Sequence, residues 1–268
     1  PRVPPSRGKD IVLTIDADLQ EIVEEELERT VHAYQARGGV GILLDPRNGE
    51  ILVMANFPGF NPNLMGRGDP ESWKNRAVCD LFEPGSTFKI VMAIVGLAEE
   101  AVSLKEVLPV GSPWMEVSGV RIKDWKEHGD LSFEEVIWRS SNMGAVQVTQ
   151  RVGKKKFYQY AQGLGFGCRT GIDLPGEAKG VLGSPDEWSP LRFANLAFGQ
   201  GLTVTALQLA CAYAAIANKG VLVKPRVAKA VLQEEREELG IGSRVVRRAI
   251  PEEVAATITK VLVGVIER

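Results

Sequence analysis

Cysteine and histidine are scarce in this chain of 268 residues. The three cysteines, Cys79, Cys168 and Cys211, are widely spaced and odd in number, and they include no C-x-x-C pair. A disulfide framework is therefore not indicated, and Cys211, within an apolar helical stretch, is interpreted as a small core residue. The two histidines, His32 and His128, lie far apart without the spacing of metal ligands. The sequence thus disfavours a metal site and a histidine-based triad, and it indicates no cofactor.

Long hydrophobic runs are also missing, because no stretch approaches the roughly 18–20 residues that a membrane-spanning helix needs. There is no sign of a secretory signal peptide. The net charge of −2 gives no reason to expect nucleic acid or an anionic membrane surface as a partner. With 44% hydrophobic and 25% charged residues, the chain can bury one sizeable core. Residues 1–9 are rich in proline and are interpreted as a linker from an upstream domain. Taken alone, the sequence would also permit a complete cytoplasmic protein.

Among the residues that are present, the segment Glu83–Lys89 gives the strongest indication of catalytic chemistry. It places Ser86 and, three residues later, Lys89 on one face of a helix start. Residues 90–98 are apolar all round, which predicts a buried helix. A lysine beside such a helix is either desolvated, with a lowered pKa, or satisfied by close polar partners. A serine next to a lysine of lowered pKa is an activated nucleophile. The simpler alternative is an N-cap serine with a snorkelling lysine, and S-x-x-K alone favours it.

A second polar group, Ser140-Ser141-Asn142, lies between a short helix predicted over residues 133–139 and another over about 143–152. Side chains at such a junction can point into a cleft. A second hydroxyl can pass a proton between lysine, nucleophile and leaving group, and an asparagine amide can orient a substrate amide. In this order, the two motifs match the first two of the three motifs of penicillin-recognising serine acyl-transferases, S-x-x-K, S-D-N and K-T-G.

The resemblance extends well beyond these motifs, and the chain resembles the transpeptidase domain of a class B penicillin-binding protein of the cell-division or sporulation type. The matching phrases follow the expected order over roughly residues 10 to 225: Asp10–Asp16 with Leu19-Gln20, Asp45–Leu52, Pro58–Asn63, Asn75–Ala77, Glu83–Lys89, Ser140–Gly144, Thr170–Glu177 and Phe198–Leu202. The resemblance implies the α+β fold shared by penicillin-binding proteins and serine β-lactamases, with a helical lobe and an antiparallel sheet. It also implies peptidoglycan D,D-transpeptidation through an acyl-serine intermediate.

The same resemblance implies roles for particular side chains. Ser86 would attack the penultimate D-Ala carbonyl or a β-lactam amide, Lys89 would accept the proton, and Ser140 would relay a proton to the leaving amine. Asn142 would hold the substrate backbone. Trp125 is expected either to line the donor cleft or to anchor its loop on the core, and the sequence favours neither.

The implied partners are peptidoglycan stem peptides ending in D-Ala-D-Ala, β-lactam antibiotics, and membrane proteins of the division or elongation machinery. The implied location is the bacterial cell membrane, with the catalytic domain on the extracytoplasmic, periplasmic side.

One departure from the family pattern concerns the third motif. No Lys-Thr-Gly follows Gln200-Gly201, and Arg169-Thr170-Gly171 precedes a separate family phrase that belongs on a loop. The resemblance places the strand with that motif after Arg268. We therefore expect residues 10–268 to form a transpeptidase domain whose sheet and active site are incomplete, with slow or absent acylation.

Three alternatives stay open at this stage. A serine β-lactamase shares the nucleophile and the lysine but needs a group that activates the deacylating water, and no counterpart of the class A glutamate can be located. Ser141, in place of the aspartate of S-D-N, also favours the penicillin-binding proteins. A β-lactam sensor domain would form a stable adduct without cross-linking. A non-catalytic scaffold of a wall-synthesis complex is disfavoured by the intact Ser86–Lys89 and Ser140–Asn142 motifs.

The remaining pattern predicts one α+β unit. The expected elements are a strand over residues 11–15, a helix capped by Asp16 or Asp18 and ended by Gly38-Gly39, a hairpin of 40–44 and 50–55 around an Asn-Gly turn, helices begun by the capping boxes Ser132/Glu135 and Thr205/Gln208, a helix over 154–163, a strand-like stretch over 221–232 broken by Pro225, and a last helix over 252–266.

Overall fold

The structure is a computed structural model that describes residues 8–64, 69–232 and 238–267. Its α-helices are α1 (Ala17–Ala33), α2 (Arg76–Cys79), α3 (Lys89–Ala98), α4 (Phe133–Trp138), α5 (Asn142–Val152), α6 (Lys154–Gly163), α7 (Pro190–Leu196), α8 (Ala206–Ala217) and α9 (Glu252–Glu267). Short 3₁₀ turns are η1 (Pro62–Leu64), η2 (Pro70–Trp73), η3 (Gly85–Phe88) and η4 (Pro185–Glu187). In the described residues, no helix is both long enough and apolar enough to cross a bilayer.

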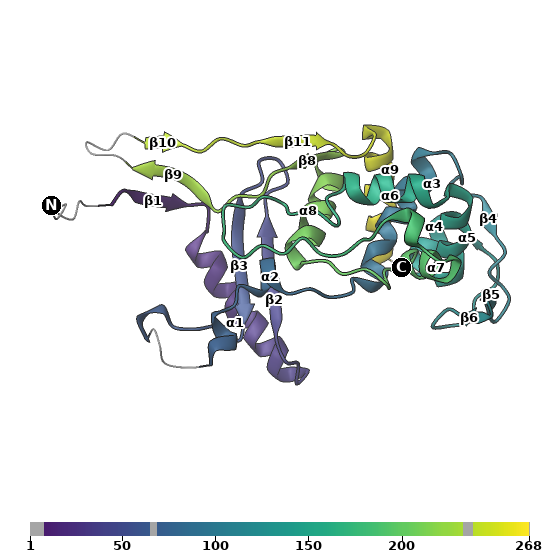
Figure 1. Ribbon diagram of the computed structural model, residues 1–268, viewed down its shortest axis with the longest axis horizontal. Coiled ribbons are helices and arrows are strands. Elements are labelled where there is room, and N and C mark those ends of the chain that lie inside the picture. The colour runs from purple at the N-terminus through teal and green to yellow at the C-terminus, as the bar shows by residue number, and fades with distance from the viewer. Residues whose placement is uncertain (1–7, 65–68, 233–237, 268) are drawn as a thin grey trace.

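The strands form several small antiparallel sheets rather than one large sheet. They are β1 (Asp10–Leu13), β2 (Gly39–Leu44), β3 (Ile51–Phe57), β4 (Val107–Leu108), β5 (Met115–Val117), β6 (Val120–Ile122), β7 (Leu131–Ser132), β8 (Val221–Val223), β9 (Ala228–Leu232), β10 (Glu238–Gly240) and β11 (Val245–Arg248). The pairings are β1-β9-β10, β11-β8, β2-β3, β4-β7 and β5-β6. Figure 1 shows β1, β9 and β10 extending as an arm at one end and α3 to α7 gathered at the other.

The N-terminal part builds a helix-covered hairpin. Asp16 caps α1 by accepting a hydrogen bond from the Leu19 N–H at 3.1 Å. The helix packs along β3, and β3 pairs with β2 from Gly39↔Phe57 to Leu44↔Ile51. This antiparallel pairing confirms the predicted hairpin, with Asn48-Gly49 between its two strands. A mixture of helices and antiparallel sheets results, so the predicted α+β class is confirmed.

Helix α3 forms the centre of the core because it has no polar face. Every residue from Lys89 to Gly96 is buried, and α5, α6 and α9 pack around the helix. Fully burying one large aliphatic side chain contributes about 1.5–3 kcal/mol, so this apolar segment is held firmly in place. Phe88, at the base of the helix, packs edge-on against Phe157 and Phe166. The start of α3 is therefore fixed on a rigid support.

Several expected boundaries are confirmed and others are wrong. Both predicted capping boxes form, at the starts of α4 and α8, and Cys211 is a buried residue of α8 as expected. Helix α1 ends at Ala33, about four residues before the glycine pair that was expected to end it, because Gln35, just after the C-cap Tyr34, has a φ of +50°. Gly39 is already the first residue of β2. Helix α7 and the hairpin of β5 and β6 were not predicted. Most of the interpreted linker, residues 1–7, lies outside the described residues.

Candidate active site

Ser86 lies in the 3₁₀ turn η3, which leads directly into α3. Its side chain is exposed, whereas the helix behind it is buried. A second segment packs against this turn: the Gly85 N–H donates to the Gly199 carbonyl oxygen at 3.0 Å, and the Gly201 N–H donates to the Glu83 carboxylate at 2.8 Å. Gly199 has a φ of +80°, and a Cβ there would lie 2.0 Å from the Gly85 carbonyl oxygen. A glycine at this position therefore permits the close approach.

Lys89 begins α3 one turn after Ser86, and only 4% of its surface is exposed. Its Nζ donates to Ser140 Oγ at 2.9 Å and also to the Ser140 carbonyl oxygen. Burial lowers the pKa of Lys89 to about 8, and the nearby charge of Asp124 opposes that decrease. The amine is thus desolvated and has polar partners at once, so it does not snorkel into solvent as the simpler interpretation required.

Ser140 occupies the corner between α4 and α5 in an unusual backbone conformation, with a φ of +54°. The next residue, Ser141, is the N-cap of α5, and its Oγ accepts a hydrogen bond from the Gly144 N–H at 3.0 Å. A non-glycine residue at positive φ is uncommon and costs free energy unless its surroundings hold it. This corner directs the Ser140 side chain to Lys89 on another helix.

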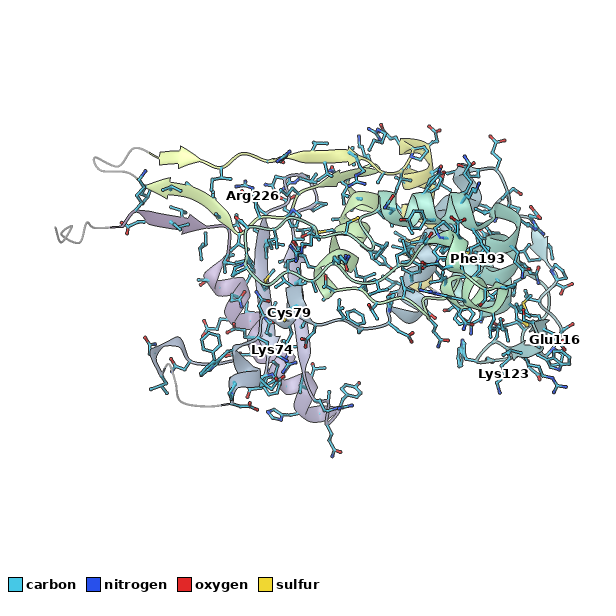
Figure 2. The ribbon with its side chains drawn as sticks, viewed as in Figure 1. Lys74, Cys79, Glu116, Lys123, Phe193 and Arg226 are labelled. Carbon is cyan, nitrogen blue, oxygen red and sulfur yellow. The ribbon has the colours of Figure 1, made fainter. Side chains whose placement is uncertain are left out.

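Asp124 is a site residue that the sequence reasoning missed. Its carboxylate accepts three hydrogen bonds from the start of α5: from Ser141 Oγ at 2.7 Å, from the Asn142 N–H at 2.5 Å and from the Met143 N–H at 3.1 Å. The preceding carbonyl oxygen, of Lys123, accepts from Asn142 Nδ2 at 3.1 Å. Lys123, labelled in Figure 2, lies at the end of the molecule that holds α7 and the β5–β6 hairpin. Asp124 lies 17 residues before Ser141, and no local pattern in the sequence signals this contact.

Ser86 and Asn142 meet at one cleft of about 450 Å³. Other residues that line it come from η3, β6, α7 and the segment after α7, and they include Gly85, Arg121, Asn195, Phe198 and Gln200. Trp125 is not among the lining residues, and its side chain is 78% exposed. It therefore does not pack on the core as a loop anchor, and a role at the donor cleft stays a prediction.

The Arg169-Thr170-Gly171 sequence lies on a loop, as expected, and not on a strand beside the cleft. Glu177, which is 9% exposed, closes this loop by accepting hydrogen bonds from Thr170 Oγ1 at 2.6 Å and from the Gly171 N–H at 3.0 Å. The backbone N–H of Thr170 donates to the same carboxylate. Thr170 and Gly171 thus stabilise the loop through their hydrogen bonds to Glu177.

The arrangement suits nucleophilic acyl transfer. With a pKa of about 8, about a tenth of the Lys89 amine is neutral at pH 7, roughly 300-fold more than for an unperturbed lysine. A neutral amine can accept a proton, and the bonded Ser140 hydroxyl can pass one on. The exposed Ser86 hydroxyl lies on the turn that begins α3, where backbone N–H groups favour a developing negative charge. In the described residues, no group of three or more His, Cys, Asp or Glu side chains is placed to hold a metal ion.

Comparison with known proteins gives consistent similarities. A family described as "Penicillin binding protein transpeptidase domain" matches residues 39–268. Stage V sporulation protein D of Bacillus subtilis is 39% identical over 229 residues, which cover 84% of this chain and 35% of the relative. The probable peptidoglycan D,D-transpeptidase PenA of Neisseria gonorrhoeae is 37% identical over 219 residues, which cover 82% of this chain and 37% of the relative. The chain thus spans between a third and two fifths of the length of these curated relatives.

A solved structure is similar along the whole chain. It is that of penicillin-binding protein 3 from Mycobacterium tuberculosis in complex with aztreonam, with a TM-score of 0.91 and 35% identity. The alignment covers 100% of this chain and 60% of the other. The same protein has also been solved in complex with ampicillin.

Proposed function

This chain belongs to the penicillin-binding protein transpeptidase family, and from that premise we propose that it carries the catalytic serine of a peptidoglycan D,D-transpeptidase. The observation that carries the proposal is the buried Lys89 amine, which donates a hydrogen bond to Ser140 Oγ and lies one turn after Ser86. Residues 10–268 form the transpeptidase unit in this proposal.

Each side chain has one role in the proposed acylation. Ser86 Oγ attacks the carbonyl carbon of the penultimate D-Ala of a stem peptide, while neutral Lys89 accepts the hydroxyl proton. The new Oγ–C bond forms and the C–N bond to the terminal D-Ala breaks. Ser140, bonded to the lysine, delivers the proton to the leaving amine. Asn142 holds the substrate backbone beside the cleft that it lines with Ser86.

The second half of the reaction reverses the roles. An amine of a second stem peptide attacks the acyl carbon, its proton leaves through Ser140 and Lys89, and the Oγ–C bond breaks to restore Ser86. The net result is a new amide cross-link. A β-lactam would react in the first step only, because its amide nitrogen remains tethered to the acyl group and blocks the acceptor.

The parent protein is proposed to act in bacterial cell-wall synthesis, on the extracytoplasmic, periplasmic face of the cell membrane. Its proposed partners are stem peptides, β-lactams, and membrane proteins of the division or elongation machinery. Support comes from the relatives, which include a sporulation protein and a probable D,D-transpeptidase.

Intact mass after incubation with a fluorescent penicillin tests the proposal. Because acylation of residues 10–268 is expected to be slow or absent, the incubation is prolonged, and any adduct should be single, map by peptide analysis to Ser86 and be missing in Ser86→Ala. Labelling at another residue, or labelling that persists in Ser86→Ala, would contradict the proposed function. The lifetime of the adduct separates the alternatives, because a penicillin-binding protein keeps it whereas a β-lactamase hydrolyses it rapidly.

A further inference from the structure

We propose that Asp124 is a positioning residue of this site: its carboxylate holds the corner of Ser140, Ser141 and Asn142 in the geometry that brings Ser140 to Lys89. The inference rests on the proposed function of Ser86 and Lys89, and it assigns a role to a residue outside the three motifs.

The contacts of Asp124 involve both of its carboxylate oxygens. Oδ1 accepts from the Asn142 and Met143 N–H groups, and Oδ2 accepts from the Ser141 hydroxyl. The first N–H groups of a helix have no partner within the helix, and a negative charge there also interacts favourably with the helix dipole. Ser141 in turn accepts from the Gly144 N–H. Asp124 and Ser141 together therefore satisfy the N–H groups of the first turn of α5.

Asp124 affects Lys89 through the corner between α4 and α5, because Ser140 in that corner is the hydrogen-bond partner of Lys89. The backbone at Ser140 has a φ of +54°, a conformation that persists only where neighbouring contacts hold it. From the α4 side, the Ser140 N–H donates to the Ile137 carbonyl oxygen and the Ser141 N–H to that of Val136. From the α5 side, Asp124 accepts hydrogen bonds from Ser141 Oγ and from the Asn142 N–H. The corner is thus fixed at both ends.

The same segment also sets the direction of the Asn142 amide. Because Asn142 Nδ2 donates to the Lys123 carbonyl oxygen, Oδ1 and the second N–H of the amide are the groups left for a substrate at the cleft. Lys123 and Asp124 therefore orient one substrate-binding side chain and, through the corner, one proton-relay side chain.

Asp124 also acts electrostatically on Lys89, since its negative charge raises the pKa that burial lowers. The helices packed on α3 are α5, α6 and α9. Where the structure describes their charged side chains, these side chains either have a partner other than Lys89 or are exposed. Arg151 pairs with Glu106, Lys154 donates to the Trp188 carbonyl oxygen, Lys156 pairs with Glu99 and Glu252 pairs with Lys219, while Lys155, Glu253 and Lys260 are exposed.

Two substitutions separate the hydrogen bonds that Asp124 accepts from the electrostatic effect of its negative charge. Asp124→Asn keeps the shape and one acceptor oxygen but removes the charge, whereas Asp124→Ala removes the acceptors as well. Asp130→Asn is the matched control, because this exposed carboxylate of the same loop accepts a hydrogen bond from the Gly111 N–H and has no contact with the start of α5 among the described residues. We expect Asp124→Ala to acylate at least tenfold more slowly with penicillin, Asp124→Asn to fall between it and the unaltered chain, and Asp130→Asn to match the unaltered chain.

Two readouts without substrate distinguish this role from general stabilisation and from failure of the proposed function. Amide hydrogen exchange should speed up at residues 142–144 in Asp124→Ala while the core of α3 stays protected. In Asp124→Asn, the ¹³C NMR titration of the Lys89 ε-carbon should move to lower pH. Unchanged exchange and an unchanged titration would overturn the proposal, whether or not Ser86 labels. If Asp124→Ala fails to fold, the titration of Asp124→Asn decides, and an unshifted curve counts against the inference.

Discussion

At the scale of single residues, Lys89 shows how one amine can be held ready to accept a proton. Burial disfavours its charged form, while the charge of Asp124 opposes that effect. The result is a pKa of about 8, close to neutral pH. A general base is most effective in that range because it is partly neutral and still basic enough to take a proton.

Acylation of Ser86 should therefore rise with pH. Below about pH 8 the Lys89 amine is protonated and cannot accept the hydroxyl proton, so the rate should fall about tenfold per pH unit. The measurement is the second-order rate constant of penicillin labelling between pH 6 and 10. Lys89→Met should abolish labelling, whereas Lys105→Met, at a lysine exposed on the surface, should not. A rate that is flat across this range would argue against Lys89 as the base.

The same pKa predicts a dependence of stability on pH. Lys89 has a lower pKa in the folded chain than in the unfolded chain, where the value is near 10.5, so between about pH 8 and 10.5 the unfolded state binds more protons. The contribution of Lys89 to the free energy of unfolding should then rise with pH in this window, by roughly 2–3 kcal/mol in total. Burial raises the pKa values of Cys211, Tyr160 and Tyr213 to about 12, which lowers stability with pH in any variant that keeps these residues. Urea unfolding of the unaltered chain and of Lys89→Met is therefore compared at pH 8 and pH 10. The unaltered chain should gain stability relative to Lys89→Met between the two pH values, and equal slopes in both chains would refute the prediction.

At the scale of elements, local patterns predicted what local physics determines. The capping boxes Ser132/Glu135 and Thr205/Gln208 are four-residue signals, and both form as expected. The hairpin β5–β6 is short, and its position depends on packing that no local pattern encodes. Asp124 likewise meets Ser141 only after the chain has folded back over 17 residues. The motifs thus indicated Ser86, Lys89, Ser140 and Asn142, but not the residue that orients their corner.

The two capping boxes should differ in their contribution to stability. Gln208 is 1% exposed, and its Nε2 also donates to the carbonyl oxygens of Cys168 at 2.6 Å and Lys179 at 2.9 Å. Gln208→Ala would leave these buried acceptors unpaired and should lower the free energy of unfolding by about 2–4 kcal/mol. Ser132→Ala, which removes a half-buried cap, should cost about 1 kcal/mol. Denaturant midpoints measure both, and an equal loss in the two variants would contradict the argument.

At the scale of the whole molecule, the chain combines a deeply buried helical core with an exposed apolar face. Within the described residues, β2 pairs with β3 along one edge only. Beside β2, the helices α8 and α9 line a cleft of about 530 Å³ with Leu43, Tyr213, Leu262, Val263 and Ile266. Leu43 is 41% exposed, and Ile266 is 89% exposed. An apolar face next to an unpaired strand edge is a surface that attracts apolar ligands and other strands.

This face should bind the dye ANS (8-anilinonaphthalene-1-sulfonate) in the folded state. The dye fluoresces on contact with exposed apolar surface, and the cleft beside β2 is large enough to take it. Leu43→Glu places a negative charge in that cleft and should reduce the fluorescence severalfold. Ile22→Glu, at an exposed apolar residue of α1 outside the cleft, makes the same charge change and should have little effect. Equal fluorescence in the two variants would show that the dye binds elsewhere, and the apolar face would then not be the main exposed surface of this chain.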